Sequence, residues 1–448
     1  MINRFKPIPA LCLLLFAGQA AWAQSPGGWS LRKCIDYARE NNIQVHSTQV
    51  TQQSSQEDLA EAKAKRVPSL DFSTSQNYVN QKSEKTDGNF EANGTYSGNY
   101  ALKTGITIYN GSKLTNSLRQ QEVINKSRQF QVDMARNDIE IAVTQAYLNI
   151  LYANENVKIS RQTVESSAAQ LERSKALLEA GSIAPSDYAQ MESQYSSDKY
   201  QLTVSQTSLD QNILTLKQLL ELGLDESFDV QFPDLSSEDV LAEVPALDRV
   251  YRRALEVMPQ VENSRLNVES AQLGEKIAAG DGLPSLTASA SIGTGNISGT
   301  NYSFYNQLNN KLNENVGITL SVPIFNNRKA KSSIARSRLQ TRQAELDYQS
   351  MEKDLLKDVE SLYQDAVSAQ SRYLAANDKV KSAETSYGLV LAQFNEGMKN
   401  TVELLTEKNN YLSAQQEQIQ AKYQAVLSIK LLNFYQNEPI TLETIKKI

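Results

Sequence analysis

The residue types that carry nucleophilic, metal or phosphate chemistry are scarce in this sequence of 448 residues. His46 is the only histidine, which excludes histidine-rich metal clusters and nucleophile–histidine–acid triads. Phosphate-binding loops of the GxxxxGKS/T or GxGxxG type are absent, and the Gly-Thr-Gly at 293–295 falls in an expected loop. The carboxylates are scattered along predicted helix faces, where water solvates them. We therefore expect no enzyme activity, no catalytic residue, no metal site and no cofactor.

Residues 1–23 have the composition of a signal peptide for export. Arg4 and Lys6 precede a short apolar run at 11–16, and Ala21-Trp22-Ala23 has the small-x-small form of a cleavage site. The apolar run is too short to cross a bilayer as a helix, and no cysteine follows it in a lipoprotein-like context. We expect an exported chain without a lipid anchor.

The rest of the composition narrows the class of partner. A formal net charge of -6 argues against nucleic acid, whose phosphates bind basic surfaces. Once Cys12 leaves with the signal peptide, Cys34 stands alone, so an intramolecular disulfide is excluded. After residue 23 no stretch approaches the roughly 18 apolar residues of a membrane helix. The mature chain is therefore either free in the periplasm or in contact with the membrane through β-strands.

The sequence is a duplication that holds one register from end to end. Shifted by 216 residues, as from Leu31 to Leu247, it matches itself without a gap. The matches place Leu31, Ala38, Pro68-Ser69-Leu70, Ile108, Asn110, Tyr147, Ala153, Gly181, Tyr195, Ile213 and Leu216 on Leu247, Ala254, Pro284-Ser285-Leu286, Ile324, Asn326, Tyr363, Ala369, Gly397, Tyr411, Ile429 and Leu432. Between the copies, residues 223–246 hold two prolines and several acids with little periodicity, which predicts a linker.

Each copy predicts a helix, two strands, a very long helix, a turn at a glycine and a second helix. The first copy (24–222) has a helix near 30–66, strands at 68–80 and 96–109, the long helix at 112–179 and a helix at 186–222. The second copy (247–437) has a helix near 247–281, strands at 284–293 and 312–325, the long helix at 328–395, a helix at 401–437, and then a tail at 438–448. At about 1.5 Å per residue, each long helix would reach on the order of 100 Å and needs support along its length.

Both long helices carry an apolar seam with alternating spacings of four and three residues, which predicts left-handed antiparallel coiled coils. The seams are Ile139, Val143, Ala146, Ile150, Ala153, Val157, Ser160, Val164, Ser167, Leu171, Ser174 and Leu178, and Leu355, Val359, Leu362, Ala366, Ala369, Tyr373, Ala376, Val380, Ala383, Tyr387, Val390 and Phe394. Such a seam also marks the core of an ordinary bundle. The remaining faces are rich in Gln, Ser, Asn, Lys and Glu, which favours a thin wall of paired helices that is wet on both sides.

The strand segments alternate apolar and polar residues. The apolar sets include Tyr96, Tyr100, Leu102, Ile106 and Ile108, then Leu312, Val316, Ile318, Leu320, Val322 and Ile324, with Leu70, Phe72, Tyr78 and Leu286, Ala288, Ala290, Ile292 in the partner strands. This alternation is typical of transmembrane β-strands and also of half-buried soluble strands. Four such segments with long polar loops, and with no other apolar surface to cover them, favour the membrane.

Four strands cannot close a barrel, and open strand edges are not tolerated in lipid, so a membrane location requires several copies. Two copies would form an eight-stranded barrel filled by side chains, and three would form a twelve-stranded barrel with an aqueous lumen. The helices of three copies would likewise close into a tube of twelve. Counting strands does not by itself exclude the dimer.

In these features the chain resembles the TolC-like outer-membrane efflux protein family over nearly all of its mature length. The resemblance rests on the order and spacing of the duplicated unit, its junctions Ile108-Tyr109-Asn110-Gly111 and Ile324-Phe325-Asn326-Asn327, and its tips Leu178-Glu179-Ala180-Gly181 and Phe394-Asn395-Glu396-Gly397. It implies a homotrimer in outer-membrane lipid, with a β-barrel joined to an α-barrel that extends into the periplasm. It also implies a passive export channel of a tripartite efflux or type I secretion system, which docks a periplasmic adaptor and, indirectly, an inner-membrane pump.

By the same resemblance, the two glycine turns form the periplasmic mouth. The residues implied to contact the adaptor are Ala180, Gly181, Ser182, Glu396, Gly397 and Met398. The gate residues implied are Asp187 and Lys399 as an ion pair, Phe394 at the position of a family hydroxyl aromatic, Glu403 as the acid that lines the aperture, and Thr406 where a second family acid is missing. Ser186 or Asp187 is expected to cap the helix that follows the first turn.

Two other classes of protein stay open. A structural or adhesive periplasmic coiled coil without a membrane barrel would be soluble without detergent and would conduct no ions. A pump adaptor also contains a helical hairpin, but adaptors carry lipoyl-like and β-barrel segments that are not found in this sequence. Outer-membrane fractionation with a crosslinked trimer would separate the three classes.

Overall fold

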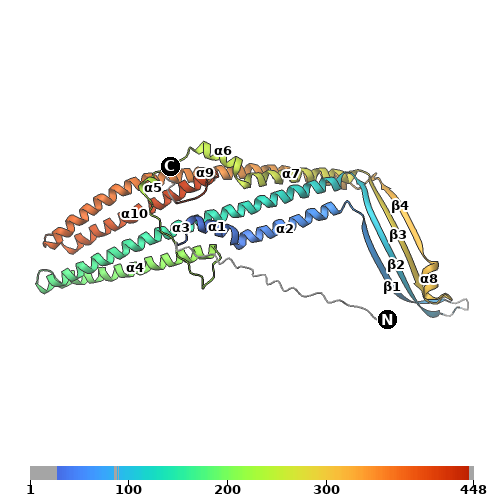
Figure 1. The fold of residues 1–448 in the computed structure, drawn as a ribbon, viewed down its shortest axis with the longest axis horizontal. Helices are drawn as coiled ribbons and strands as arrows, with labels where there is room; N and C mark the ends of the chain where they lie inside the picture. Colours follow the sequence, from blue (N-terminus) through green and yellow to red (C-terminus); the bar gives the residue numbers. More distant parts are fainter. Residues whose placement is uncertain (1–27, 85–87, 89, 443–448) are drawn as a thin grey trace, which may run out of the picture.

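The fold, taken from a computed structural model, is described for residues 28–84, 88 and 90–442. An elongated stack of helices carries a four-stranded sheet at one end (Figure 1). The expected signal peptide at 1–23 and the last residues of the expected tail, 443–448, lie outside the described residues.

The two copies repeat the same order of elements. The first consists of α1 (Leu31–Asn41), α2 (Ile43–Ala64), β1 (Ser69–Glu84), β2 (Phe90–Asn110), α3 (Lys113–Glu179) and α4 (Pro185–Leu219). After α5 (Ser237–Val240), the second consists of α6 (Leu247–Val257), α7 (Pro259–Ala279), η1 (Gly280–Gly282), β3 (Ser285–Ile297), α8 (Phe304–Asn310), β4 (Asn313–Ser321), α9 (Lys329–Asn395) and α10 (Thr401–Phe434).

The long helices α3 and α9 have 67 residues each and run from the sheet to the far end of the molecule (Figure 1). Lys113 and Lys329, their first residues, are 216 positions apart, as the duplication requires. A residue in the left-handed conformation precedes each helix, Ser112 with φ 63° and Arg328 with φ 66°. The two copies therefore share even the backbone turn that leads from strand to helix.

Shorter helices support α3 and α9 along their whole length. Next to the sheet, α2 packs on α3, and α7 packs on both α3 and α9. In the far half, α4 pairs with α3 and α10 pairs with α9 (Figure 1). Every position of the two predicted seams is buried or half-buried. The main apolar cluster lies at mid-length, where α1, α3, α6, α9 and α10 contribute buried side chains.

The sheet has the order β1-β2-β3-β4 and is antiparallel throughout. One of its faces is apolar and exposed within the protomer, with Phe72 68%, Val316 85% and Ile318 71% accessible to solvent. The other face carries polar side chains such as Asp71 and Lys103, which are direct cross-strand partners. Because β1 and β4 are the ends of this order, each has a free edge in the described protomer.

The first helix of each copy is not continuous, contrary to the prediction. Asn42 has an extended backbone between α1 and α2, and its side chain accepts a hydrogen bond from the backbone N–H of Gln44. In the second copy the break falls at Met258, and Pro259 occupies the first position of α7, where its missing N–H costs nothing. The mid-length cluster packs around these breaks, since Asn42 and Met258 are both buried.

The connections also contain structure that the sequence pattern did not indicate. The linker includes α5, and Val230 forms a parallel β-bridge with Trp29. The loop between β3 and β4 contains the helix α8. The first hairpin extends to 84 and 90, beyond its predicted ends, whereas β4 stops at Ser321, short of the predicted 325. Among the described residues, no helix is both long and apolar enough to cross a bilayer.

Candidate functional site

The ends of the two helix hairpins, α3–α4 and α9–α10, form the tip of the molecule farthest from the sheet (Figure 1). Gly181 (φ 72°) and Gly397 (φ 74°) end the long helices in the left-handed conformation. In the first turn, the N–H groups of Gly181 and Ser182 donate to the carbonyls of Leu178 (2.9 Å) and Leu177 (2.8 Å). This pair of hydrogen bonds is the Schellman motif, which glycine favours because it has no Cβ.

The second turn repeats this geometry. Gly397 N–H donates to Phe394 at 3.0 Å, and Met398 N–H donates to Gln393 at 2.9 Å. A Cβ at either glycine would meet no atom within 4 Å. All six predicted adaptor-contacting residues are exposed: Ala180, Gly181, Ser182, Glu396, Gly397 and Met398.

The two return helices begin differently, and the prediction that Ser186 or Asp187 caps the first of them is wrong. Helix α4 starts at Pro185 with Ala184 as its N-cap, and no side chain caps it. Asp187 lies instead in the first turn, where a carboxylate is stabilised by the helix dipole. Helix α10 has a complete capping box, in which Asn400 and Glu403 each accept a hydrogen bond from the other's backbone N–H.

Glu403 forms an ion pair with Lys399 at 2.5 Å, and both side chains are more than a third exposed. The hydrogen bond from Lys399, followed by the backbone N–H of Asn400, lowers the pKa of Glu403. Within the described part of one protomer no ion pair joins Lys399 to the half-buried Asp187. Thr406 is exposed, and its hydroxyl donates to the carbonyl of Val402 at 2.8 Å. The carboxylate of Glu403 therefore stays ionised at neutral pH beside one lysine.

Phe394, which is both the last position of the predicted seam in α9 and a residue implied for the gate, does not lie at the surface of the tip. It is 4% exposed and belongs to an apolar cluster with Met191, Leu404 and Leu405. These four side chains come from α9, α4 and α10. Phe394 thus packs the two hairpins together from the inside, because an aromatic ring without a hydroxyl loses nothing by complete burial.

A buried ion pair that was not predicted from the sequence joins the two hairpins behind this cluster. Lys408 of α10 contacts Asp198 of α4 at 2.5 Å, and their side chains are 3% and 8% exposed. Asp198 also accepts hydrogen bonds from Ser167 of α3 at 2.6 Å and from Gln194 at 2.8 Å. The carboxylate is thus fully engaged, as a buried charge requires. We refer to these four residues as the Asp198 network.

A second polar contact joins α3 to α9 at a nearby level. Gln170 Nε2 donates to the hydroxyl of Tyr387 at 2.7 Å, and Ser166 Oγ lies 3.3 Å from the same hydroxyl. Closer to the turns, Arg173 of α3 also donates to the carbonyl of Asn395 in α9 at 3.4 Å. One apolar cluster and these polar contacts therefore hold the two hairpins together at the tip.

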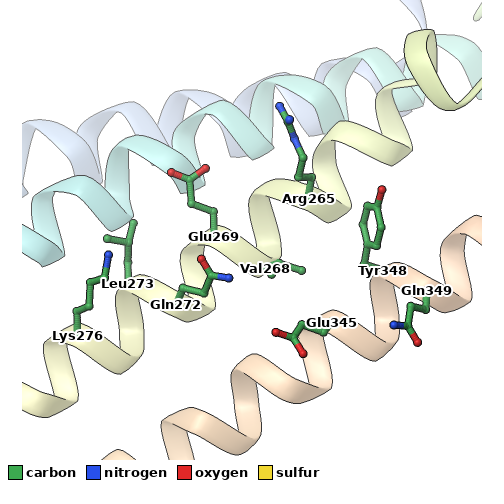
Figure 2. Close-up of a pocket in the computed structure, with 9 residues that line it drawn as sticks. All are labelled: Arg265, Val268, Glu269, Gln272, Leu273, Lys276, Glu345, Tyr348 and Gln349. Atoms are coloured by element: carbon green, nitrogen blue, oxygen red, sulfur yellow. The ribbon is translucent and has the colours of Figure 1, made fainter.

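The wall of helices also has an open groove of ≈ 700 Å³ between α7 and α9. Figure 2 shows Arg265, Glu269 and Lys276 of α7 with Glu345 and Tyr348 of α9 around it. The charges are mixed in sign, and Arg265 already pairs with Glu262 at 2.6 Å. Among the described residues no group of three potential metal ligands is found. The groove is a polar, open part of the helical wall.

A duplicated wall of long helices, a polar tip and a sheet with an apolar outward face define the subunit of a channel that crosses an outer membrane. The sequence profile of the outer membrane efflux protein family matches residues 34–221 and 250–433. The chain belongs to this family, and the two matches begin 216 residues apart. It is an outer-membrane conduit that extends into the periplasm, and it is not an enzyme.

Individual relatives are distant in sequence but similar in length. The outer membrane efflux protein BepC of Brucella suis biovar 1 (strain 1330) is 22% identical, over 96% of this chain and 90% of that protein. The outer membrane protein TolC of Escherichia coli (strain K12) is 22% identical, over 94% and 84%. A crystal structure of CusC has a TM-score of 0.77 at 16% identity and covers 92% of this chain and 95% of that one. The predicted class and fold are confirmed.

Proposed function

We propose that three copies of this chain assemble into the outer-membrane channel of a tripartite efflux or type I secretion system. The observation that supports this assembly most directly is the sheet, which exposes an apolar face and ends in two free edges. In lipid such edges have to pair, and pairing β4 of one copy with β1 of the next closes the sheet. Three copies supply twelve strands, enough for an aqueous lumen. CusC, whose fold this chain shares, forms a transmembrane channel.

The duplication supplies the register of the joint between copies. Because β2 and β4 are equivalent, as are β3 and β1, the β2–β3 pairing inside the protomer is a template for the β4–β1 pairing between protomers. Lys103 faces Ser291 in that template. The residue equivalent to Lys103 in the second copy is Thr319, and the residue equivalent to Ser291 in the first copy is Ser75. We therefore expect Thr319 of one copy to face Ser75 of the next. Both are on the polar face of the sheet, so the transfer also preserves which face points into the lumen.

Cysteines at these two positions should crosslink neighbouring copies. Antiparallel partners have Cα atoms about 4.5–5.5 Å apart, a separation that a disulfide spans. The double variant Ser75→Cys/Thr319→Cys is expected to form a covalent trimer on mild oxidation in outer membranes, detected on a denaturing gel. Cys34 is buried and does not compete.

The matched control is Ser75→Cys/Asn313→Cys, because residue 313 lies six residues, or about 20 Å, along β4 from residue 319. This control variant should give no crosslinked dimer or trimer on the gel. A covalent product that stops at the dimer would contradict three copies. A soluble, detergent-free protein without crosslinks would instead support a periplasmic coiled coil.

The tips would form the periplasmic mouth in this trimer. Glu403 of each copy would contribute to a ring of carboxylates, and Asp187 would pair with Lys399 across the boundary between copies. The lowered pKa of Glu403 supports a permanently charged ring at neutral pH. The exposed turn residues around Gly181 and Gly397 would meet the helical hairpin of an adaptor, which in turn contacts the inner-membrane pump. The inner-membrane pump would supply the energy for export, because the channel itself is passive.

Glu403→Gln should reduce the preference of the channel for cations. Glutamine can still accept the backbone N–H of Asn400, so the capping box and the helix start are kept while the charge is removed. The ratio of cation to anion permeability, from reversal potentials in planar bilayers under a KCl gradient, is expected to fall by roughly half or more. Exposed Glu396→Gln, in the turn itself, serves as control. If Glu403→Gln left the ratio of cation to anion permeability unchanged, Glu403 would not line the narrowest part of the channel.

A further inference from the structure

The short helix α8 between β3 and β4 lies against the apolar face of the sheet. Thr294, which follows Ile292 on that face, donates its hydroxyl to the carbonyl of Leu308 in α8 at 2.5 Å. The backbone N–H of Ile297 donates to Gln307 at 2.7 Å. Gln307 is 8% exposed and also donates to the carbonyl of Tyr302 at 3.0 Å. The helix is thus fastened to the outer end of β3 by its polar side (Figure 1).

These contacts leave three aromatic side chains exposed, two in the first turn of α8 and one just before it. Tyr302, Phe304 and Tyr305 are 64%, 54% and 78% exposed. We call these three residues the α8 aromatic patch. The polar contacts hold the helix without these side chains, so packing inside the protomer does not explain why three large aromatic groups within four residues are exposed.

The height of α8 coincides with the upper limit of the apolar band. On β4 the outward set Val316, Ile318 and Leu320 is exposed and apolar, but the next outward residue toward the loop is Glu314, the partner of Ile292. A carboxylate on the lipid-facing side marks where hydrocarbon ends. The contacts of α8 with Thr294 and Ile297 lie just beyond this level on β3.

We infer that the α8 aromatic patch sits in the headgroup zone of the outer leaflet and contacts the lipid there. Aromatic side chains with a polar tip partition to that zone, and girdles of such residues flank the apolar band of membrane β-barrels. The patch continues the apolar face of β3 and β4, so lipid that covers this face also reaches α8. This inference rests on the proposed closed barrel, which turns that face outward.

Tryptophan scanning with depth-resolved quenchers tests the placement. Tyr305→Trp is reconstituted into phosphatidylcholine vesicles carrying bromine at acyl carbons 6 and 7 or at carbons 11 and 12, and iodide is added from the water. The controls are Val316→Trp, in the apolar band, and Asn99→Trp, on the polar face at a similar height. The unsubstituted protein supplies the background of Trp29, which packs against Tyr37 and Phe228 in the helical part.

Tyr305→Trp is expected to lose fluorescence most with the shallow bromines, Val316→Trp with the deep ones, and Asn99→Trp with iodide alone. If Val316→Trp follows the lipid quenchers while Tyr305→Trp follows only iodide, the barrel stands and the lipid contact of α8 is overturned. If Tyr305→Trp is shielded from both quenchers, α8 contacts a neighbouring copy and the inference is likewise overturned. If Val316→Trp also escapes the brominated lipid, the barrel proposal itself fails.

Discussion

Lys408→Ala is expected to weaken the tip of the molecule by about 3–5 kcal/mol, because it leaves a buried carboxylate without its counter-charge. Asp198 and Lys408 are 8% and 3% exposed, and Asp198 lies between the two hairpins, where water cannot replace the lysine. Hydrogen bonds from Ser167 and Gln194 remain, but they do not neutralise the charge. The apolar cluster around Phe394 should then loosen with it, because it lies between the same helices.

Hydrogen exchange measures this loss locally, without requiring the whole trimer to unfold reversibly. Backbone amides of α4 and α10 flanking the Asp198 network should exchange more than about a hundredfold faster in Lys408→Ala, while those of α2 and α7 keep their rates. Lys379→Ala is the matched control: Lys379 joins α9 to Glu417 of α10 at 2.8 Å, but both side chains are about half exposed. Such a surface pair contributes about 0–1 kcal/mol.

A second variant separates charge from packing. Asp198→Leu/Lys408→Met replaces the pair by apolar side chains of similar size and should restore most of the protection, since apolar replacement of a buried pair is often neutral or stabilising. Equal exchange rates in Lys408→Ala and Lys379→Ala would mean that water reaches Asp198 in the assembled protein. The buried pair would then not hold the hairpins together.

The features that were predicted correctly from the sequence are those whose pattern repeats over many residues. The seams of α3 and α9 recur over twelve positions each, and none of these positions is exposed. The duplication fixed the relative position of both long helices, down to the left-handed residues Ser112 and Arg328. Repetition averages out local exceptions, so both patterns survive substitution at single sites.

The features that were missed depend on one or two residues. Asn42 and Met258 break a helix that periodicity alone continues, because the break is set by packing at mid-length. Helix α8 is seven residues long and is held by contacts to β3, which no local pattern reveals. The outer end of the first hairpin has no third strand beside it, because β2 pairs with β1 from Phe90 onward but with β3 only from Ser97.

The Asp198 network was not predicted from the sequence for a different reason. Duplication predicts equivalent positions, but residue 414, equivalent to Asp198, is a buried alanine, and residue 192, equivalent to Lys408, is an exposed glutamate. The pair therefore breaks the repeat. One signal was available: Asp198 lies seven residues after Met191, and Lys408 lies seven after Thr401, and all four are buried. A charge at a seam position needs a partner, and the opposite hairpin supplies it.

Lys399→Glu is expected to make the resting channel leak. The wild-type lysine, which precedes the N-cap of α10, contacts Glu403 at 2.5 Å, so the substitution places two carboxylates next to each other in every copy. Like charges at this spacing repel each other, and a trimer brings all of them to one mouth. In the proposed assembly, the same change also removes the partner of Asp187 in the neighbouring copy. Both effects push the tips apart. We therefore expect the conductance of the closed state in planar bilayers to rise roughly several-fold.

Two double variants identify the partner that holds the closed state. Lys399→Glu/Glu403→Lys restores the pair inside each copy, whereas Lys399→Glu/Asp187→Lys restores a pair only across the boundary between copies. We expect the second to reduce the leak more than the first, because only the second restores a contact between copies. Neither should reach the resting level, because each leaves one of the two effects of Lys399→Glu in place. Lys399→Met, which removes the charge without adding a new one, should leak less than Lys399→Glu. A closed-state conductance that Lys399→Glu leaves unchanged would show that the apolar cluster and the Asp198 network hold the tips without help from surface charge.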